Sequence, residues 1–172
     1  AGMTLMDKAP EPGKVVKTGT QEGAGITEWM LSNGVKVVLK PTDFKQDEIV
    51  FRAMSPGGSS LASDADYIAA SSAAQAVSIT GVGKFSAMDL RKVLAGKIAS
   101  VRPLIAETEE GLSGSGSPKD LETLFQLIYL NFTAPRSDPS AFAAYTAQGK
   151  AVLANQQASP MFAFAQTLQS TL

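Results

Sequence analysis

The chain has 172 residues, enough for one domain with a buried core, and 44% of them are hydrophobic while 18% are charged. These proportions are typical of a folded chain rather than a disordered one. The net charge of -1 gives no electrostatic reason to expect binding to nucleic acid or to an anionic membrane. No apolar run approaches the ~20 residues of a membrane span, and the absence of cysteine excludes disulfides and thiolate chemistry.

The first part of the chain differs in composition from the rest. Residues 1–25 are rich in proline and glycine and show no hydrophobic period. They are predicted to form a linker or interdomain arm, followed by a folded domain over 26–172. The apolar segment Met161–Leu172 reaches the end of the sequence without a helix-ending signal, which predicts that this domain continues beyond it.

Two strands are predicted at the start of the domain. Asn33-Gly34 is a strong turn signal because both residues tolerate a positive φ. The segment Val35–Leu39 then alternates apolar residues on one face, and Pro41 ends it because proline has no N–H to donate. A second alternating segment follows at Glu48–Met54. These two segments are predicted to pair as an antiparallel hairpin.

Helices and strands alternate in the middle of the chain. An alanine-rich helix is predicted over 65–79, capped by Asp64 and ended by Gly81. Ser86-Ala-Met-Asp89 resembles a capping box and predicts a short helix. A strand is predicted over Lys97–Ala106, where Pro103 favours either the edge of a sheet or a bend.

The segment Gly111–Ser117 is predicted to be a second strand or a loop of small residues. Two amphipathic helices follow, opened by Ser117-Pro118 and by Asp138-Pro139. The order of elements predicts an α+β fold in which an antiparallel sheet carries helices packed on one face.

Residue types limit the chemistry of the chain. It contains no histidine, so no serine has the usual activating base, and a catalytic zinc site lacks its usual ligands. Gly81-Val-Gly83 is only half of a dinucleotide-binding fingerprint and is predicted to be a helix-ending turn. Glu107, Glu109 and Glu110 are predicted to face water in a turn.

Four segments together resemble one repeat of the insulinase/pitrilysin family of zinc metallopeptidases. They are the Leu-x-Asn-Gly strand Leu31–Lys40, the Gly-Ser segment Ser55–Ser60, the alanine-rich helix before Gly81, and Asp120–Thr133, which is similar to a later helix of long bacterial members. The resemblance covers 26–172 and depends on the order and spacing of these segments. It implies a fold like that of the mitochondrial processing peptidase.

The resemblance also implies where a metal site would fall. Catalytic repeats of the family carry His-x-x-Glu-His on the helix after the Gly-Ser segment, which binds zinc and polarises water. That motif would fall near Ser72, Gln75 and Ala76, and a distal glutamate ligand near Asn155. Because the chain has no histidine, it is expected to hold no catalytic, cofactor-binding or metal residue, and zinc is expected only in the parent enzyme.

The function implied by the resemblance is that of a non-catalytic domain from the C-terminal half of a long bacterial zinc-dependent endopeptidase. Such a domain would form part of a peptide-binding chamber and contact other repeats of the same polypeptide. The substrate would be a peptide or unfolded protein, and the compartment would be periplasmic or extracellular. Gly57 and Gly58, beside an exposed strand, are expected either to lie near a bound peptide or to form a structural turn.

Two alternatives from other functional classes stay open at this point. One is a catalytically inactive structural or assembly subunit of the same fold. The other is an independent binding module or a hydrolase that needs no metal.

Overall fold

The computed structural model describes residues 4–171. Ala1–Met3, in the expected linker, and Leu172, in the expected last helix, lie outside the described residues. The elements in chain order are β1 (Val15–Gln21), η1 (Glu22–Ala24), β2 (Ile26–Leu31), β3 (Lys36–Leu39), β4 (Ile49–Pro56), η2 (Ser59–Leu61), α1 (Tyr67–Thr80), α2 (Ala87–Val93), β5 (Ala99–Ile105), β6 (Glu109–Gly116), η3 (Pro118–Asp120), α3 (Leu121–Thr133), α4 (Pro139–Gln157) and α5 (Pro160–Thr171).

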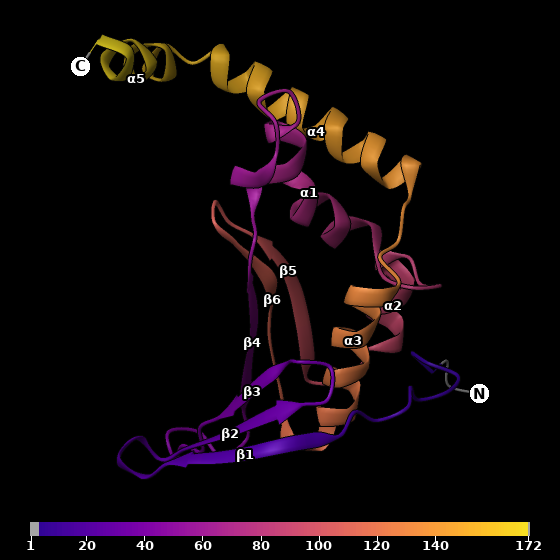
Figure 1. Ribbon diagram of the computed structural model, residues 1–172. Coiled ribbons are helices and arrows are strands. Elements are labelled where there is room, and N and C mark those ends of the chain that lie inside the picture. Colours follow the sequence, from indigo (N-terminus) through magenta and orange to yellow (C-terminus); the bar gives the residue numbers. More distant parts are fainter. Residues whose placement is uncertain (1–3, 172) are drawn as a thin grey trace.

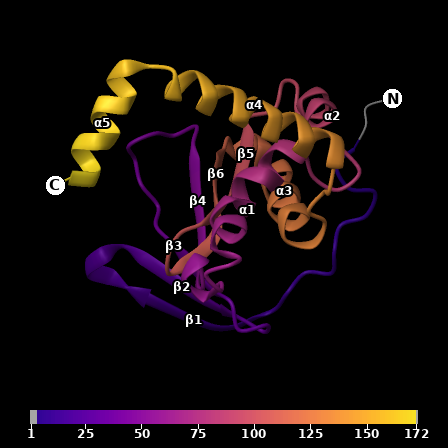
Figure 2. The ribbon, with the colours of Figure 1, turned by 90° about the horizontal axis from the view of Figure 1, so that it is seen from above.

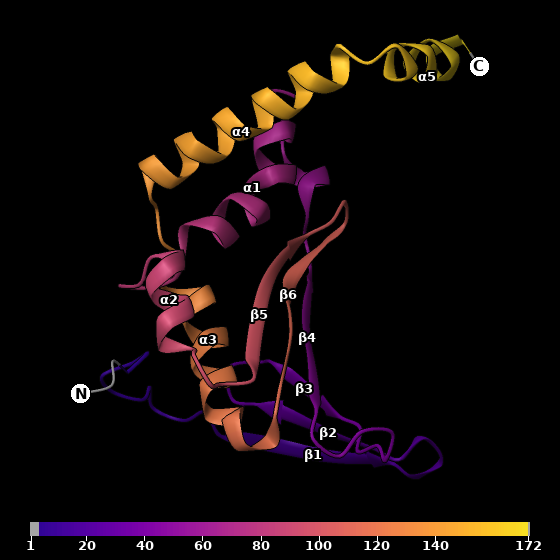
Figure 3. The ribbon, with the colours of Figure 1, turned by 180° about the vertical axis from the view of Figure 1, so that it is seen from behind.

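The strands form two antiparallel sheets of three strands each, in the orders β1-β2-β3 and β4-β6-β5. Helices α1 and α3 pack against β5 of the larger sheet. The smaller sheet crosses one end of the larger one, and α4 lies at the opposite end (Figures 1 and 3). The predicted α+β class with antiparallel sheets is therefore confirmed.

The predicted strands exist, but the predicted hairpin between them is wrong. Strand β3 pairs with β2, whereas β4 pairs with β6 in the other sheet. The Asn33-Gly34 turn joins β2 to β3, with Gly34 at φ 85° and the Asn33 side chain accepting a hydrogen bond from the Val35 N–H. The turn signal was therefore correct, and the partner strand precedes it in the sequence.

The segment expected to be a linker is anchored at two places. Strand β1 pairs along most of its length with β2, and Leu5 is buried in a cluster with Val82, Phe85 and Leu127. Residues 15–24 of the expected linker thus form regular structure, namely β1 and η1. A domain boundary near residue 25 stays a prediction.

The middle of the chain forms the helices and the strand that its sequence predicts, with a difference at one helix cap. Helix α1 ends at Gly81, whose φ is 96°, and Ser86 caps α2 by accepting the Asp89 N–H at 3.1 Å. The N-cap of α1 is Asp66 rather than the predicted Asp64. Pro103 lies on β5, which is an edge strand as predicted.

The choice left open for 111–117 is settled in favour of a strand. Strand β6 lies in the centre of the larger sheet. Its glycines allow close strand approach, since a Cβ at Gly114 would lie 2.2 Å from the Ser100 carbonyl oxygen. Glu109 and Glu110 belong to β6 rather than to a turn, and Glu109 forms an ion pair with Arg52 at 2.7 Å.

Candidate functional site

Three of the four positions inferred from the resemblance lie on α1. Ser72 and Gln75 are exposed and Ala76 is half-buried. The Ser72 hydroxyl donates to the Ile68 carbonyl oxygen, 2.6 Å away, within its own helix. A hydroxyl engaged in this way, an amide and a methyl group do not form a zinc-binding set.

The fourth position, Asn155, is exposed on α4, a helix that packs against α1. Its amide is also a poor ligand for zinc beside histidine, cysteine or carboxylate groups. Among residues 4–171, no three His, Cys, Asp or Glu side chains gather in a way that could hold a metal ion. The side chains at the four inferred positions therefore do not form a zinc-binding set.

A groove lies between α1, α2, α3 and β5. Its volume is about 460 Å³, within the range of small-ligand sites. Gln75 is the inferred position that lines it. The other lining residues are Val77, Ser78, Ile79, Gly81, Val82, Leu90, Leu94, Ala99, Ser100, Val101, Arg102, Pro103, Leu127 and Asn131. Arg102 is the charged residue among them, and the polar ones are Gln75, Ser78, Ser100 and Asn131. The other lining residues are apolar or glycine, so the groove is mostly apolar with a few polar groups.

Gly57 and Gly58 lie at the end of β4 and pack against the β5–β6 turn. The Gly57 N–H donates to the Thr108 carbonyl oxygen at 3.2 Å, and the Gly58 N–H points to a Glu110 carboxylate oxygen at 3.4 Å. Gly58 has φ 90°, and a Cβ there would lie 2.5 Å from the Ala106 carbonyl oxygen. The fold therefore requires glycine at position 58 for conformational and steric reasons.

Strand β4 is the other edge of the larger sheet. Within the described residues its outer backbone pairs with no strand. Val50 is 77% exposed and Met54 is 55% exposed on this strand. An eight-residue edge with exposed apolar side chains is a template on which an extended peptide can add as a further strand.

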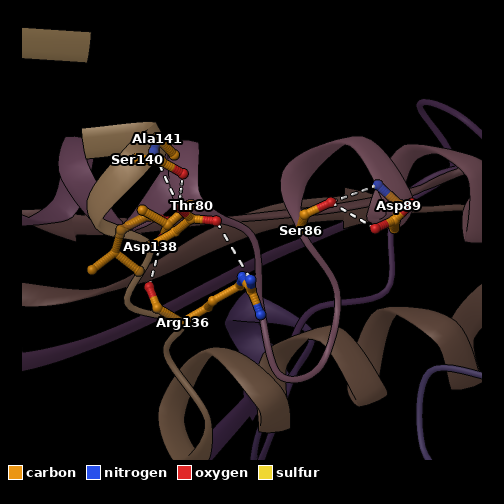
Figure 4. Close-up of polar contacts among 8 residues, drawn as sticks. Thr80, Ser86, Asp89, Arg136, Asp138, Ser140 and Ala141 are labelled. Carbon is orange, nitrogen blue, oxygen red and sulfur yellow. Dashed lines mark hydrogen bonds and ion pairs between the residues drawn. The ribbon is translucent and has the colours of Figure 1, made fainter. Parts of the chain in front are cut away.

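A polar junction holds the end of α1 against the start of α4 (Figure 4). The Thr80 hydroxyl donates to the Arg136 carbonyl oxygen at 2.6 Å. Asp138 caps α4 by accepting the Ala141 N–H, and a hydrogen bond from Ser140 lowers the pKa of its carboxyl group. The Thr80 contact spans 56 residues, so no local sequence signal identifies it, whereas the Asp138-Pro139 pair predicts the start of α4 from neighbouring residues alone.

The chain is similar in sequence to two known zinc proteases. No profile of a known protein family matches the chain. It is 32% identical over 114 residues to a probable zinc protease PqqL of Haemophilus influenzae, a match that covers 66% of the chain. It is 30% identical over 129 residues to a PQQL-like zinc protease of Arabidopsis thaliana, covering 75% of the chain.

Solved structures show the same fold. The periplasmic protease PqqL from Escherichia coli superposes with a TM-score of 0.79 and 25% identity over 99% of this chain. A mutant of the ferredoxin protease FusC, in complex with Arabidopsis ferredoxin, superposes with a TM-score of 0.77 over 94% of the chain. At 23% identity, the FusC similarity shows the fold alone.

The chain therefore corresponds in sequence and in fold to a part of zinc peptidases of the insulinase-like family. It spans 12% and 11% of the length of the two curated relatives. It also spans 19% of the E. coli PqqL chain.

Proposed function

We propose that the chain is a non-catalytic domain of a longer zinc-dependent endopeptidase, here called the parent protein. The observation that carries this proposal is a mismatch between the chain and its relatives. The relatives are zinc proteases, yet this chain has no histidine and no cysteine. Zinc in the parent protein would therefore be bound by residues outside this chain, and this domain would contribute shape and surface.

We further propose that the domain forms part of the peptide-binding chamber through the outer edge of β4. The unpaired backbone of this edge strand supports the proposal, because backbone pairing holds an extended peptide whatever its sequence. Gly57 and Gly58 support the end of the strand in this proposal. Their N–H groups already point to Thr108 and Glu110, so they are not free to hold a peptide.

The proposed compartment is the periplasm or the cell exterior. The E. coli relative of known structure is a periplasmic protease, and the proposal extends that location to the parent protein. Over residues 4–171, no helix has both the length and the apolar character that a membrane crossing needs.

The first experiment compares zinc content and peptide cleavage in the 172-residue chain and in the parent protein. We expect bound zinc and chelator-sensitive cleavage in the parent protein and neither in the chain alone. Neither property in the parent would contradict the proposal and favour an inactive structural subunit. Cleavage by the chain alone that survives chelation would contradict it in favour of a metal-free hydrolase.

The second experiment tests the peptide-binding edge in the parent protein. Val50→Lys places a charge on the β4 edge, and charged side chains on an edge strand disfavour strand addition. We expect KM for a long peptide to rise on the order of fivefold with kcat unchanged, because binding rather than chemistry is weakened. The matched control is Val16→Lys, which adds the same charge to β1, an edge of the smaller sheet. Equal KM values for the two variants would contradict a role for β4.

A further inference from the structure

Strand β4 has one face toward the helices and one face away from them. Seen from above, the strand lies on the side of the larger sheet away from α3 (Figure 2). Gly116 of β6 pairs with Ile49 of β4, and a Cβ at Gly116 would lie 3.4 Å from the side chain of Leu124 on α3. Paired residues share a face of a sheet, and successive residues alternate between faces. Ile49 and every second residue after it therefore face the helices, and the residues between them face away.

The face of β4 that points away from the helices carries an apolar, a basic and an apolar side chain at every second position. These are Val50, Arg52 and Met54, and all three are exposed. The side chain of Arg52 is 54% exposed. The order of the three residue types is the same in both chain directions. A peptide strand therefore meets the same pattern whether it adds parallel or antiparallel to β4.

Arg52 can bind a carboxylate from a ligand in addition to its partner within the domain. Its Nη2 donates to Glu109 Oε1 at 2.7 Å, whereas a guanidinium group has five N–H donors. Arg102 stands on the same face, because Arg52 and Arg102 both pair with Ser113. Two arginines and one glutamate therefore lie on this face of β4, β5 and β6, so its charge is complementary to an acidic ligand.

We infer that the β4 edge selects extended peptides in which an acidic residue stands between two apolar residues at every second position. The inference rests on the proposed binding of peptides at β4. A strand added to this edge would place each side chain about 5 Å from the one opposite. A carboxylate opposite Arg52 would meet its guanidinium, and residues two positions away would meet Val50 and Met54. Backbone pairing alone allows a peptide to slip along the edge, and the charged contact sets its register.

The test compares two labelled peptides that differ in one central residue, glutamate in one and glutamine in the other. Both carry valine two positions before and two positions after that residue. Fluorescence anisotropy gives the Kd of each peptide for the parent protein, before cleavage is detectable. We expect the glutamate peptide to bind about threefold more tightly, with a smaller difference at high salt because exposed charges are screened. Equal Kd values at low salt would overturn the inference.

A matched pair of variants assigns the preference to one arginine. Arg52→Gln removes the charge beside the added strand, whereas Arg102→Gln removes the same charge from the same face two strands away. The backbone of Arg102 lies roughly 14 Å from an added strand, beyond the screening length of about 8 Å. We expect Arg52→Gln to abolish the preference for glutamate and Arg102→Gln to keep it. Equal loss in both folded variants, as judged by circular dichroism, would overturn the inference in favour of a general attraction to acidic peptides.

A charge reversal makes the assignment stricter. In Arg52→Glu, a peptide with lysine at the central position is expected to bind more tightly than the glutamate peptide, because opposite charges on paired strands attract and like charges repel. An unchanged preference for glutamate in this variant would overturn the inference.

Val50→Lys distinguishes failure of this inference from failure of the proposed function. If that variant weakens binding of the glutamine peptide while both peptides bind the original protein equally, the inference fails and the peptide-binding edge stands. If Val50→Lys and its control Val16→Lys bind the glutamine peptide equally well, the peptide-binding edge and the inference fail together.

Discussion

The carboxylate of Asp120 accepts a hydrogen bond from the backbone N–H of Ile98, 3.0 Å away, although 22 residues separate the two in sequence. The same oxygen accepts the Ser117 hydroxyl at 2.8 Å, and Lys97 forms an ion pair with the other oxygen at 3.3 Å. Asp120 is only 4% exposed. One side chain thus joins the start of α3 to the start of β5.

This arrangement predicts how stability depends on pH. The Ile98 N–H, followed by the Ser117 hydroxyl, lowers the pKa of the Asp120 carboxyl group. Hydrogen bonds from Ser86 and from Ser140 lower the pKa of Asp89 and Asp138 in the same direction. Because these pKa values are lower in the folded state, the stabilisation is complete above the ordinary aspartate pKa. It is lost as pH falls through the lowered values.

The measurement is urea unfolding of the chain between neutral and acidic pH. Asp120→Asn is expected to be less stable at neutral pH and to lose less stability in acid than the original chain. The matched control is Asp64→Asn, which removes an exposed carboxylate. Identical acid profiles for the original chain and for Asp120→Asn would show that this carboxylate does not contribute.

Two of the glycines with φ near 80–90°, Gly58 and Gly96, are expected to differ in how much an alanine substitution destabilises the fold. Gly58 (φ 90°) would place a Cβ 2.5 Å from a backbone oxygen, whereas Gly96 (φ 79°) has nothing within 4 Å of that position. Gly96→Ala is expected to cost about 1–2 kcal/mol from backbone conformation alone. Gly58→Ala should cost a further about 1–3 kcal/mol because the backbone of 106–107 must shift. Denaturation midpoints check the order, and equal costs would contradict the steric argument.

The cap of α2 predicts a loss of stability when its hydroxyl is removed. Ser86 accepts the Asp89 N–H that the helix itself cannot satisfy. Ser86→Ala is therefore expected to lower the free energy of unfolding by about 1 kcal/mol. Ser78→Ala is the control, because its hydroxyl donates to a carbonyl oxygen within α1 and caps nothing. A loss of stability in Ser78→Ala as large as in Ser86→Ala would contradict the capping role.

The core predicts a large effect at Leu124, which is 1% exposed on α3. Leu124→Ala is expected to lower the free energy of unfolding by about 2–5 kcal/mol, since it removes buried methyl groups and leaves a cavity. Leu61→Ala makes the same chemical change at an 81% exposed side chain and is expected to stay within about 0.5 kcal/mol. Thermal or urea unfolding measures both, and similar values would place Leu124 outside the core.

Local signals in the sequence predicted most of the helices and strands. The Asn33-Gly34 turn, the Ser86 cap and the Asp138-Pro139 cap each depend on residues within about four positions of one another. Such contacts form from neighbouring residues alone, so the pattern of residue types determines them. The sequence alone also argues against a zinc site of the family's kind, because the absence of histidine is a property of the sequence.

Contacts between distant segments required the tertiary structure. Sequence patterns located the strand at Glu48–Met54 but did not show that it pairs with β6 rather than with β3. They also did not show that β1 extends the smaller sheet or that Leu5 enters the core. Strand pairing depends on which backbone edges and apolar faces meet after the chain has folded. The alternation of apolar and polar residues at every second position is the same whichever strand becomes the partner, so it does not identify that partner. The sequence by itself therefore determined most of the elements and the absence of the family's histidine ligands, while only the tertiary structure decided which strands pair and which strand edges stay unpaired.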